Sequence, residues 1–323
     1  MTGVALPTSV QLERRELRIA DVVLPFGERS GVIRAYLREK AAFAERTGAF
    51  QHHVVVAGLA EPRALRATLC AIEPDLLLLH DPWSGRRGGC LQAFLAFIRH
   101  VYPAAEAVIA VVAPTVDGRR ERTVPLRFGV DPAFRPGPAA QQRRHVLYAG
   151  RLGGNRGLLD LIEVTARSRE PWRLHLVGTG PARRILSARA RRLGISERVL
   201  FSLRVSDRRR LARLFAEASC VVMPGPCRPA SLLALEAAAS GANVVTCGTD
   251  PSVRLVGKLA ETFPCGDRQA LGQAIERARL RRPDLHAAAA LSEAHSWDRV
   301  FAAELRDLRG ICPSAFGGRR RAA

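Results

Sequence analysis

Short apolar runs alternate along this chain with longer segments in which apolar residues recur every three or four positions. The short runs have the length of buried strands and the longer segments have the periodicity of amphipathic helices, so together they predict βαβ units and parallel sheets. In the first part of the chain the pattern predicts strands at 19–25, 53–57, 75–80 and 107–112, and helices at 31–47, 62–72 and 90–101.

A segment rich in proline and glycine, 129–138, interrupts this alternation and is interpreted as a linker. After a second alternation and a loop, a last helix is expected from about Trp297 to Leu308. The second alternation predicts strands at 145–149, 173–177, 198–201, 219–223 and 243–246, and helices at 157–169, 181–193, 207–217, 230–240 and 268–279.

These elements predict an α/β fold with two doubly wound domains that face each other across a cleft, where ligands bind at the carboxyl ends of the strands. The chain has 323 residues, enough for two domains with full cores. We expect an N-terminal domain at 17–138, a C-terminal domain at 139–294, a helix at 295–312 that packs back on the N-terminal domain, and a basic tail at 313–323.

The net charge of +20 comes almost wholly from arginine, because lysine occurs only at positions 40 and 258. Such a bias has two readings: a GC-rich genome, or an acidic ligand such as a nucleotide, an anionic lipid surface or a nucleic acid. Aromatic residues make up only 6% of the chain and do not alternate with the arginines. A nucleic-acid partner is therefore not expected.

Seven cysteines are scattered without a C-x-x-C pair, which argues against a zinc site or a disulfide framework and for a reducing cytosol. No apolar run approaches the roughly 18 to 20 residues that cross a bilayer. We therefore expect a cytoplasmic protein, with peripheral contact to the inner face of the membrane through its basic surface as a further expectation.

Two arginines follow the strand predicted at 145–149. Arg151 comes directly after the turn residue Gly150, and Arg156 lies at the start of the next helix. Two guanidinium groups beside a helix N-terminus would form a strong diphosphate clamp, since fork geometry, charge and oriented N–H groups coincide. The alternative is that both are solvated surface residues.

Glu236 is the single carboxylate in an otherwise apolar helical segment that follows the strand at 219–223. A buried carboxylate without a partner is costly. Ribose hydroxyls would be suitable partners, as they are for acidic residues in dinucleotide folds. A salt bridge to a neighbouring arginine is the alternative.

Four motifs occur in the same order and at similar spacing as in family 4 retaining glycosyltransferases, which this chain resembles over roughly residues 17 to 308. They are Ala149-Gly-Arg-Leu with Arg156-Gly, Leu176-Val-Gly-Thr-Gly-Pro181, Pro224-Gly-Pro with Ala234-Leu-Glu-Ala, and Pro264-Cys-Gly-Asp267. The resemblance implies a GT-B fold of two Rossmann-like domains. It also implies transfer of a hexose from UDP or GDP to an unidentified acceptor with retention, and mannosyltransferases are among the nearest in character.

The resemblance also assigns roles to residues. Arg151 and Arg156, the latter in place of a usual lysine, would neutralise the leaving diphosphate. Glu236 would hold the donor ribose, and Arg204 and Val205 would lie at the base. The remaining donor-side candidates are Gly31, Gly178, Arg228, Ser231 and Leu232. The nucleotide sugar is a substrate, no cofactor or metal is implied, and the acceptor would be a polysaccharide, a glycolipid or a small molecule.

The pattern departs from the family at the E-x7-E motif, where Arg228 replaces the first glutamate and Pro229 offers no N–H. A guanidinium disfavours the positive charge that develops on the transferred sugar. The N-terminal domain is also short, and His80 and Asp81 are its acceptor-side candidates. These departures leave open a second reading, a catalytically weak or inactive relative that binds a nucleotide or a partner protein.

Overall fold

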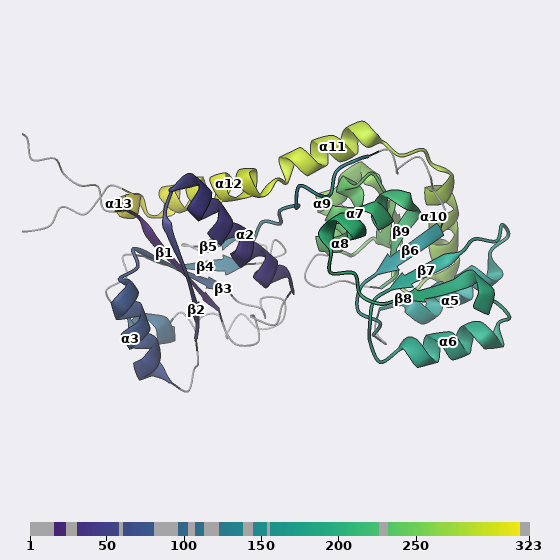
Figure 1. Cartoon of the computed structure of the whole chain (residues 1–323), viewed down its shortest axis with the longest axis horizontal. Coiled ribbons are helices and arrows are strands. Elements are labelled where there is room, and N and C mark those ends of the chain that lie inside the picture. The colour runs from purple at the N-terminus through teal and green to yellow at the C-terminus, as the bar shows by residue number, and fades with distance from the viewer. Residues whose placement is uncertain are drawn as a thin grey trace, which may run out of the picture. The chain divides into compact units, whose positions relative to one another are not determined.

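The computed structural model describes residues 16–23, 31–57, 61–80, 96–102, 107–112, 123–137, 145–153, 156–225 and 232–316. The chain divides into two compact units, each with its own parallel sheet (Figure 1). Unit 1 comprises residues 1–112, 117–126 and 301–323, and unit 2 comprises 113–116 and 127–300.

The sheet of unit 1 is formed by β1 (Arg18–Val23), β2 (Gln51–Val56), β3 (Leu76–His80), β4 (Ala107–Val112) and β5 (Thr123–Pro125). All pairings are parallel, in the order β2-β1-β3-β4-β5. The apolar run of β3 is completely buried, as expected for a parallel strand covered on both faces. One face packs against α3 (Pro62–Ile72) and the helical residues 96–101.

On the other side of unit 1 lie α2 (Gly31–Thr47) and the end of α12 (Trp297–Ile311). Helix α12 is followed by the short helix α13 (Pro313–Phe316). Phe301 of α12 packs edge-on against Tyr36 and also contacts Phe43. Lys40 of α2 is buried between two carboxylates, with its Nζ 2.9 Å from Asp21 Oδ2 and 2.8 Å from Glu304 Oε1. An ion cluster therefore ties α12 to α2 and β1.

Unit 2 has a six-stranded parallel sheet of order β11-β10-β9-β6-β7-β8. Counted from β6, this is the strand order of the doubly wound dinucleotide-binding fold. Its strands are β6 (His145–Ala149), β7 (Leu174–Val177), β8 (Val199–Ser202), β9 (Ala218–Met223), β10 (Val244–Cys247) and β11 (Ala260–Phe263).

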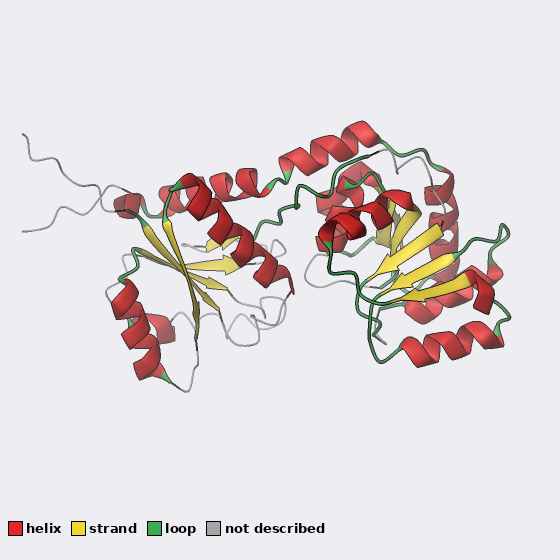
Figure 2. Cartoon of the chain, viewed as in Figure 1, coloured by secondary structure: helices red, strands yellow, loops and turns green. Residues whose placement is uncertain are grey.

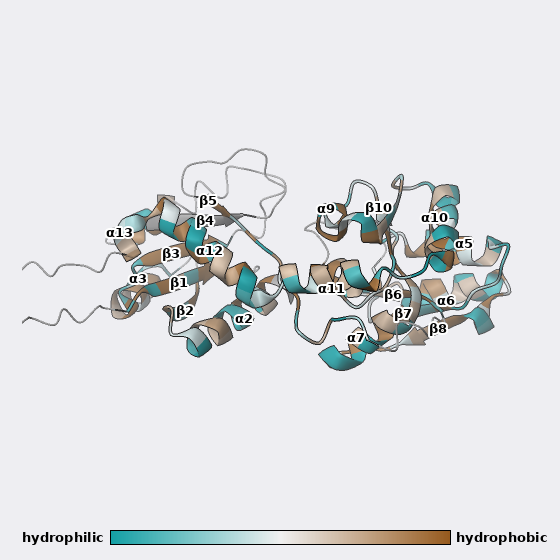
Figure 3. Ribbon diagram, turned by 90° about the horizontal axis from the view of Figure 1, so that it is seen from above, coloured by the Kyte–Doolittle hydropathy of each residue, from teal (hydrophilic) through white to brown (hydrophobic). Residues whose placement is uncertain are grey.

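Helices cover both faces of this sheet (Figure 2). On one face lie α5 (Leu158–Arg167), α6 (Arg183–Arg192) and α10 (Arg268–Leu280), and on the other lie α7 (Arg208–Glu217), α8 (Leu232–Ala239), α9 (Ser252–Val256) and α11 (Leu285–Ala294). In Figure 3 the buried strands β1 and β3 are brown, whereas much of the arginine-rich α7 is teal. The predicted fold class, two doubly wound α/β sheets, is confirmed.

Several elements were not predicted. β5 is only three residues long, and β11 lies at the sheet edge and carries polar residues, so neither has the apolar run of a buried strand. Residues 285–294 were expected in a loop but form α11. The signal for this helix was Asp284, whose side chain accepts a hydrogen bond from the Ala287 N–H at 2.8 Å and caps the first turn.

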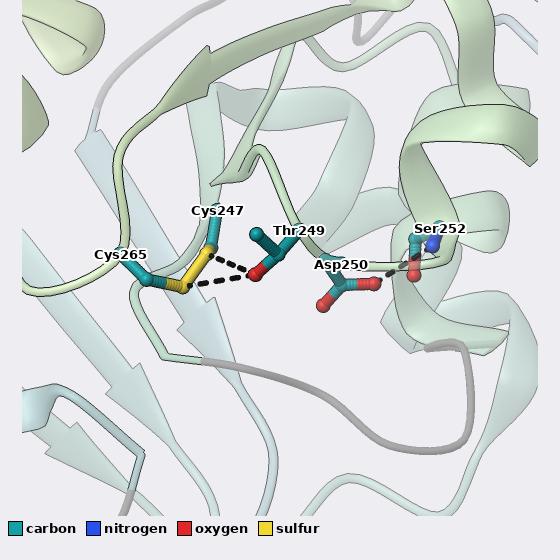
Figure 4. The surroundings of a disulfide bond; sticks show 5 residues. All are labelled: Cys247, Thr249, Asp250, Ser252 and Cys265. Atoms are coloured by element: carbon teal, nitrogen blue, oxygen red, sulfur yellow. Dashed lines mark hydrogen bonds between the residues drawn. A yellow bond between two sulfur atoms is a disulfide. The ribbon is translucent and has the colours of Figure 1, made fainter.

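The expectation that the cysteines are unpaired was wrong at one pair, because Cys247 and Cys265 form a disulfide (Figure 4). Their Cα atoms are 5.2 Å apart, and Thr249 Oγ1 lies 3.1 Å from Cys247 Sγ. Cys247 ends β10, and Cys265 follows the neighbouring parallel strand β11. Their separation of 18 residues gives no hint of this proximity, which follows from strands that end side by side.

In the described part of the chain, no helix has both the length and the apolar character that a membrane span requires.

Candidate functional site

The strand order of unit 2 reverses between β6 and β9, which are neighbours in the sheet. The chain runs from β6 outward to β8 on one side and from β9 outward to β11 on the other. Such a switch point leaves a crevice outside the carboxyl ends of the two strands, and ligands of doubly wound folds bind there. In this chain the crevice is expected beyond Ala149 and Met223.

A cavity of about 120 Å³ lies at this point. It is bounded by the ends of β6 and β9, the segment before α5 and the first turn of α8. Its lining residues are Tyr148, Ala149, Gly150, Arg151, Arg156, Met223, Pro224, Gly225 and Leu233. The structure thus brings Arg151 and Arg156, the two arginines of the predicted clamp, into the wall of one cavity at the switch point.

Two glycines let the segment before α5 pack directly against the end of β9. A Cβ atom on Gly157, whose φ is +66°, would lie 2.5 Å from the carbonyl oxygen of Pro224. A Cβ atom on Gly225 would lie 2.6 Å from the carbonyl carbon of Arg156. Only glycine allows this approach without a backbone shift. The close packing holds Arg156 against the far wall of the cavity.

The turn after β6 is fixed by hydrogen bonds to the backbone of Arg151. Its carbonyl oxygen accepts from the Tyr148 hydroxyl at 2.9 Å and from the Gly153 N–H at 3.0 Å. The Arg151 side chain is exposed, and that of Arg156 is half-buried. Arg156 precedes α5, whose N-cap residue Gly157 supplies no side-chain acceptor to the first-turn N–H groups. Two guanidiniums and an uncapped helix N-terminus make this wall attractive to an anion.

Glu236 is completely buried on α8, one turn after the cavity residue Leu233. Its Oε1 accepts a hydrogen bond from Arg208 Nη2 at 2.5 Å, so the salt bridge that the sequence left as an alternative is present. Its Oε2 has no hydrogen-bond partner among the residues that the structure describes. Burial raises the pKa of the Glu236 carboxyl to about 7 against the lowering effect of Arg208, and the nearby Asp131 carboxylate raises it further.

The other donor-side candidates of unit 2 have different surroundings. Gly178 is packed against Gly150 beneath the site, where its φ of +151° and the lack of a side chain serve backbone contact. Arg204 is exposed and Val205 is half-buried in the loop between β8 and α7, and Leu232 is the half-buried first residue of α8. No ligand contact is established for these four, so their donor roles stay predictions.

Two of the described candidates belong to unit 1. Gly31 is the exposed first residue of α2, with no atom close enough to restrict a side chain there. His80 ends β3 and is buried; its Nε2 is hydrogen-bonded to Asp21 Oδ1, while its Nδ1 has no partner in the described part of the chain. Asp21 also pairs with Lys40 and with His52 Nε2 at 2.7 Å.

Asp21 and its partners form a charged cluster in the core of unit 1. Burial raises the pKa of the Asp21 carboxyl, but Lys40, His52 and His80 outweigh it and hold that pKa well below its usual range. Burial lowers the pKa of Lys40, but Asp21 and Glu304 outweigh it and raise that pKa. These contacts give His80 a structural role, whereas its predicted acceptor-side role stays a prediction.

Asp81, Arg228 and Ser231 lie outside the described residues, as does Pro229. Their predicted roles therefore remain sequence-based. Sequence reasoning missed Arg208 and Asp131, because Arg208 stands in a run of three arginines that resembles an ordinary solvated surface. The available signal was the pairing rule itself: a buried Glu236 requires a cation.

Within the described ranges, no group of three or more histidine, cysteine, aspartate or glutamate side chains is arranged to hold a metal ion.

Residues 143–279 match the family described as glycosyl transferases group 1. Over 210 residues the chain is 30% identical to the GDP-mannose-dependent alpha-(1-6)-phosphatidylinositol dimannoside mannosyltransferase of Mycobacterium tuberculosis, in two strains. The match covers 59% of this chain and 53% of that protein, so the chain spans about half the length of the curated relatives it matches.

Solved structures with a similar fold cover almost the whole chain. Sucrose-phosphate synthase from Thermosynechococcus elongatus has a TM-score of 0.68 at 16% identity, with coverage of 91% of this chain and 99% of that one. Anabaena Alr3699/HepE in complex with UDP has a TM-score of 0.68 at 17% identity, with coverage of 90% and 100%. These similarities establish the fold alone, the GT-B fold of two Rossmann-like domains.

Proposed function

We propose that this chain transfers a hexose from a nucleotide sugar to an acceptor, because residues 143–279 match the family described as glycosyl transferases group 1. The donor in this proposal is a UDP- or GDP-hexose, and the product keeps the anomeric configuration of the donor. The observation that carries the proposal is the cavity at the β6–β9 switch point, lined by Arg151 and Arg156.

The proposed chemistry depends on the charge of the leaving group. Cleavage of the bond between the sugar and the diphosphate leaves negative charge on the diphosphate oxygens. Arg151 and Arg156 would offset this charge through bidentate, charge-assisted hydrogen bonds, and the N–H groups that begin α5 would add to it. These positive groups belong to the chain itself, so metal-independent catalysis is part of the proposal.

Glu236 would hold the donor ribose. Its Oε2 is an acceptor without a partner in the described part of unit 2, and a ribose hydroxyl is a donor of the required kind. Because this oxygen is buried, the proposal requires a local movement that exposes it to the nucleotide. Leu232, the first residue of that helix, and Arg204 and Val205, in the loop after β8, are the other proposed donor-side contacts.

The two donor bases are both supported by relatives. The mycobacterial relative is named as GDP-mannose-dependent, whereas the Anabaena protein was solved with UDP. The acceptor in the proposal is a polysaccharide, a glycolipid or a small molecule. The proposal also includes a cytoplasmic location with peripheral membrane contact through the basic surface. This part is tested by cell fractionation, in which the protein is measured in the cytosol, in the membranes after a salt wash, and in the wash itself.

The second candidate function is nucleotide binding with little or no transfer. It is favoured by Arg228 and Pro229, which replace the carboxylate and the N–H expected beside the transferred sugar. An Arg228→Glu variant distinguishes the two: the second function predicts that transfer rises while nucleotide affinity changes little. Equal turnover of parent and variant at a rate above background would argue for the first.

The direct test is incubation with UDP-glucose, UDP-galactose, GDP-mannose and GDP-glucose, with and without a panel of sugar acceptors. Free nucleotide is measured by chromatography, and the anomeric configuration of the product by proton NMR. Release of one nucleotide with a product of retained configuration supports the proposal. Inverted configuration would contradict retention, and the absence of release from every donor would reject transferase activity toward these donors.

A further inference from the structure

Arg208, the first residue of α7, contacts two segments that are distant in sequence, α8 and the turn at residues 131–134. Its Nη2 donates to Glu236 Oε1 on α8 at 2.5 Å, and its Nε lies 3.6 Å from Asp131 Oδ2. Its guanidinium carbon is 4.4 Å from the centre of the Phe134 ring, which gives a cation–π contact. The side chain is 33% exposed, so one part faces solvent while its polar tip enters the core of unit 2.

The guanidinium is held in place by a turn at residues 131–134. The Asp131 side chain accepts from the Ala133 N–H at 2.8 Å, and its carbonyl oxygen accepts from the Phe134 N–H at 2.9 Å. The Phe134 ring is completely buried and packs 6.0 Å from the ring of Phe215 on the same helix as Arg208. The turn thus places the Phe134 ring and the Asp131 carboxylate against the Arg208 guanidinium, and these contacts limit the rotation of the guanidinium.

The partner of Arg208 is a carboxylate with no exposed surface. At 3.6 Å the contact with Asp131 is an ion pair but not a hydrogen bond, so the strong bond of Arg208 goes to Glu236. Helices α7, α9 and α11 and strands β9 and β10 pack around α8. Of the charged groups on the described residues, Arg208 and Asp131 are those that influence the Glu236 carboxyl, and they act in opposite directions.

Only one oxygen of the Glu236 carboxylate, Oε1, accepts a hydrogen bond within the described residues, and Oε2 does not. Arg208 fixes Oε1, and the rotation of the carboxylate about its own axis is then set, so Oε2 has a defined direction. A neutral carboxyl in the same place could rotate and would offer a weaker acceptor. Arg208 favours the ionised form of Glu236 against the effect of burial, and it also orients that form to accept a hydrogen bond from a hydroxyl.

We infer that Arg208 is a positioning residue of the donor site, which orients the Glu236 carboxylate so that Oε2 receives a hydrogen bond from a ribose hydroxyl of the nucleotide. Arg208 acts through Glu236 rather than on the nucleotide itself, and the turn at 131–134 holds Arg208. The inference rests on the proposed function for its ligand, whereas the hold of Arg208 on Glu236 is a property of the chain alone.

The test compares Arg208→Gln and Arg208→Lys with Arg209→Gln, which removes the same charge from the exposed neighbouring position. The first readout is the titration of the Glu236 carboxyl by carbon-13 NMR, assigned with Glu236→Gln. The second is the affinity for UDP and for GDP by calorimetry between about pH 6 and pH 9, a range that brackets the raised pKa.

Arg208→Gln is expected to raise the titration midpoint of Glu236 by about one unit or more, because it removes the only adjacent cation in the described part of the chain. Nucleotide affinity at neutral pH should fall roughly fivefold, because the ionised fraction of Glu236 drops from about one half to about one tenth, and it should recover as the pH rises. Arg208→Lys should change the titration midpoint of Glu236 and the nucleotide affinity only slightly, and Arg209→Gln should leave both quantities unchanged. A purely structural role would lower affinity equally at every pH.

Asp131→Asn supplies a change of the opposite sign and covers the case in which Arg208→Gln does not fold. Asp131 raises the pKa of Glu236, so its removal should lower the titration midpoint and leave Arg208 paired. Unchanged midpoints in both variants would overturn the inference. Shifted midpoints in a parent protein that binds neither UDP nor GDP would reject the proposed function and the ligand part of the inference.

Discussion

The backbone of Gly178 lies directly against that of Gly150: a Cβ atom on Gly178 would be 1.8 Å from the Gly150 carbonyl oxygen. Gly178 follows β7 and Gly150 follows β6, so this contact joins the two loops beneath the cavity. A second contact continues it, since a Cβ on Gly180 would lie 2.2 Å from the carbonyl oxygen of Leu152. The position of Arg151 therefore depends on glycines that never touch a ligand.

Gly178→Ala is expected to destabilise unit 2 by about 3 kcal/mol, because the added methyl group must displace backbone. Denaturant unfolding followed by circular dichroism measures this loss. The matched control is Gly194→Ala, where φ is also positive, at +69°, but no atom lies near the added methyl group. The control should lose only the roughly 1–2 kcal/mol of backbone strain. Equal losses in the two variants would show that the contact with Gly150 is not tight.

The stability of the protein should depend on pH through Glu236. The pKa of Glu236 in the folded protein, about 7, is above the ordinary value for a glutamate carboxyl, 4.5, so the folded state binds more protons between these values. Stability from this group is thus present at low pH and lost as the pH rises through the window. Relative to Glu236→Gln, the parent should lose up to roughly 3 kcal/mol of unfolding free energy from about pH 4.5 to pH 8. A difference between the two proteins that does not vary with pH would contradict the burial of an ionised Glu236.

The periodicity of the sequence predicted most of this fold, since α2 and α3 and the strands β4 and β6 occur at the predicted bounds. It failed where an element is short or polar, as at β5 and β11. Arg151 and Arg156 both follow strand β6 and both line the cavity, whereas their contact with a diphosphate stays a prediction. Arg208 could not be found this way, since its partner Glu236 comes from a helix 28 residues further along the chain.

The charged cluster in unit 1 should be essential for folding of that unit. Lys40→Met leaves Asp21 and Glu304 buried without their cation, which typically costs about 3–5 kcal/mol. The control on the same helix is Arg38→Met, whose ion pair with Glu39 is exposed and should contribute less than about 1 kcal/mol. Thermal unfolding of both variants measures the contrast, and a Lys40→Met protein as stable as the control would show that the cluster contributes no net stability.

Reduction of the Cys247–Cys265 disulfide should destabilise unit 2. A cross-link that closes a loop of this length, with a sequence separation of 18, contributes roughly 3 kcal/mol. The melting temperature should fall with dithiothreitol in the parent, and it should be insensitive to dithiothreitol in Cys265→Ser. The exposed Cys70 provides the control, because Cys70→Ser should behave as the parent does. Alkylation of both Cys247 and Cys265 in the native, unreduced protein would mean that the bond is absent.

We propose that the cavity at the β6–β9 switch point binds the diphosphate of a nucleotide sugar through Arg151 and Arg156. The most direct measurement is calorimetric titration of UDP and GDP into the parent, Arg151→Gln, Arg156→Gln and the control Arg184→Gln, which removes an exposed charge from α6. Each lost charge-assisted bond is worth about 1.5–3 kcal/mol, so affinity should fall roughly tenfold or more in both cavity variants and stay unchanged in the control. Equal affinity in all four proteins would contradict the claim.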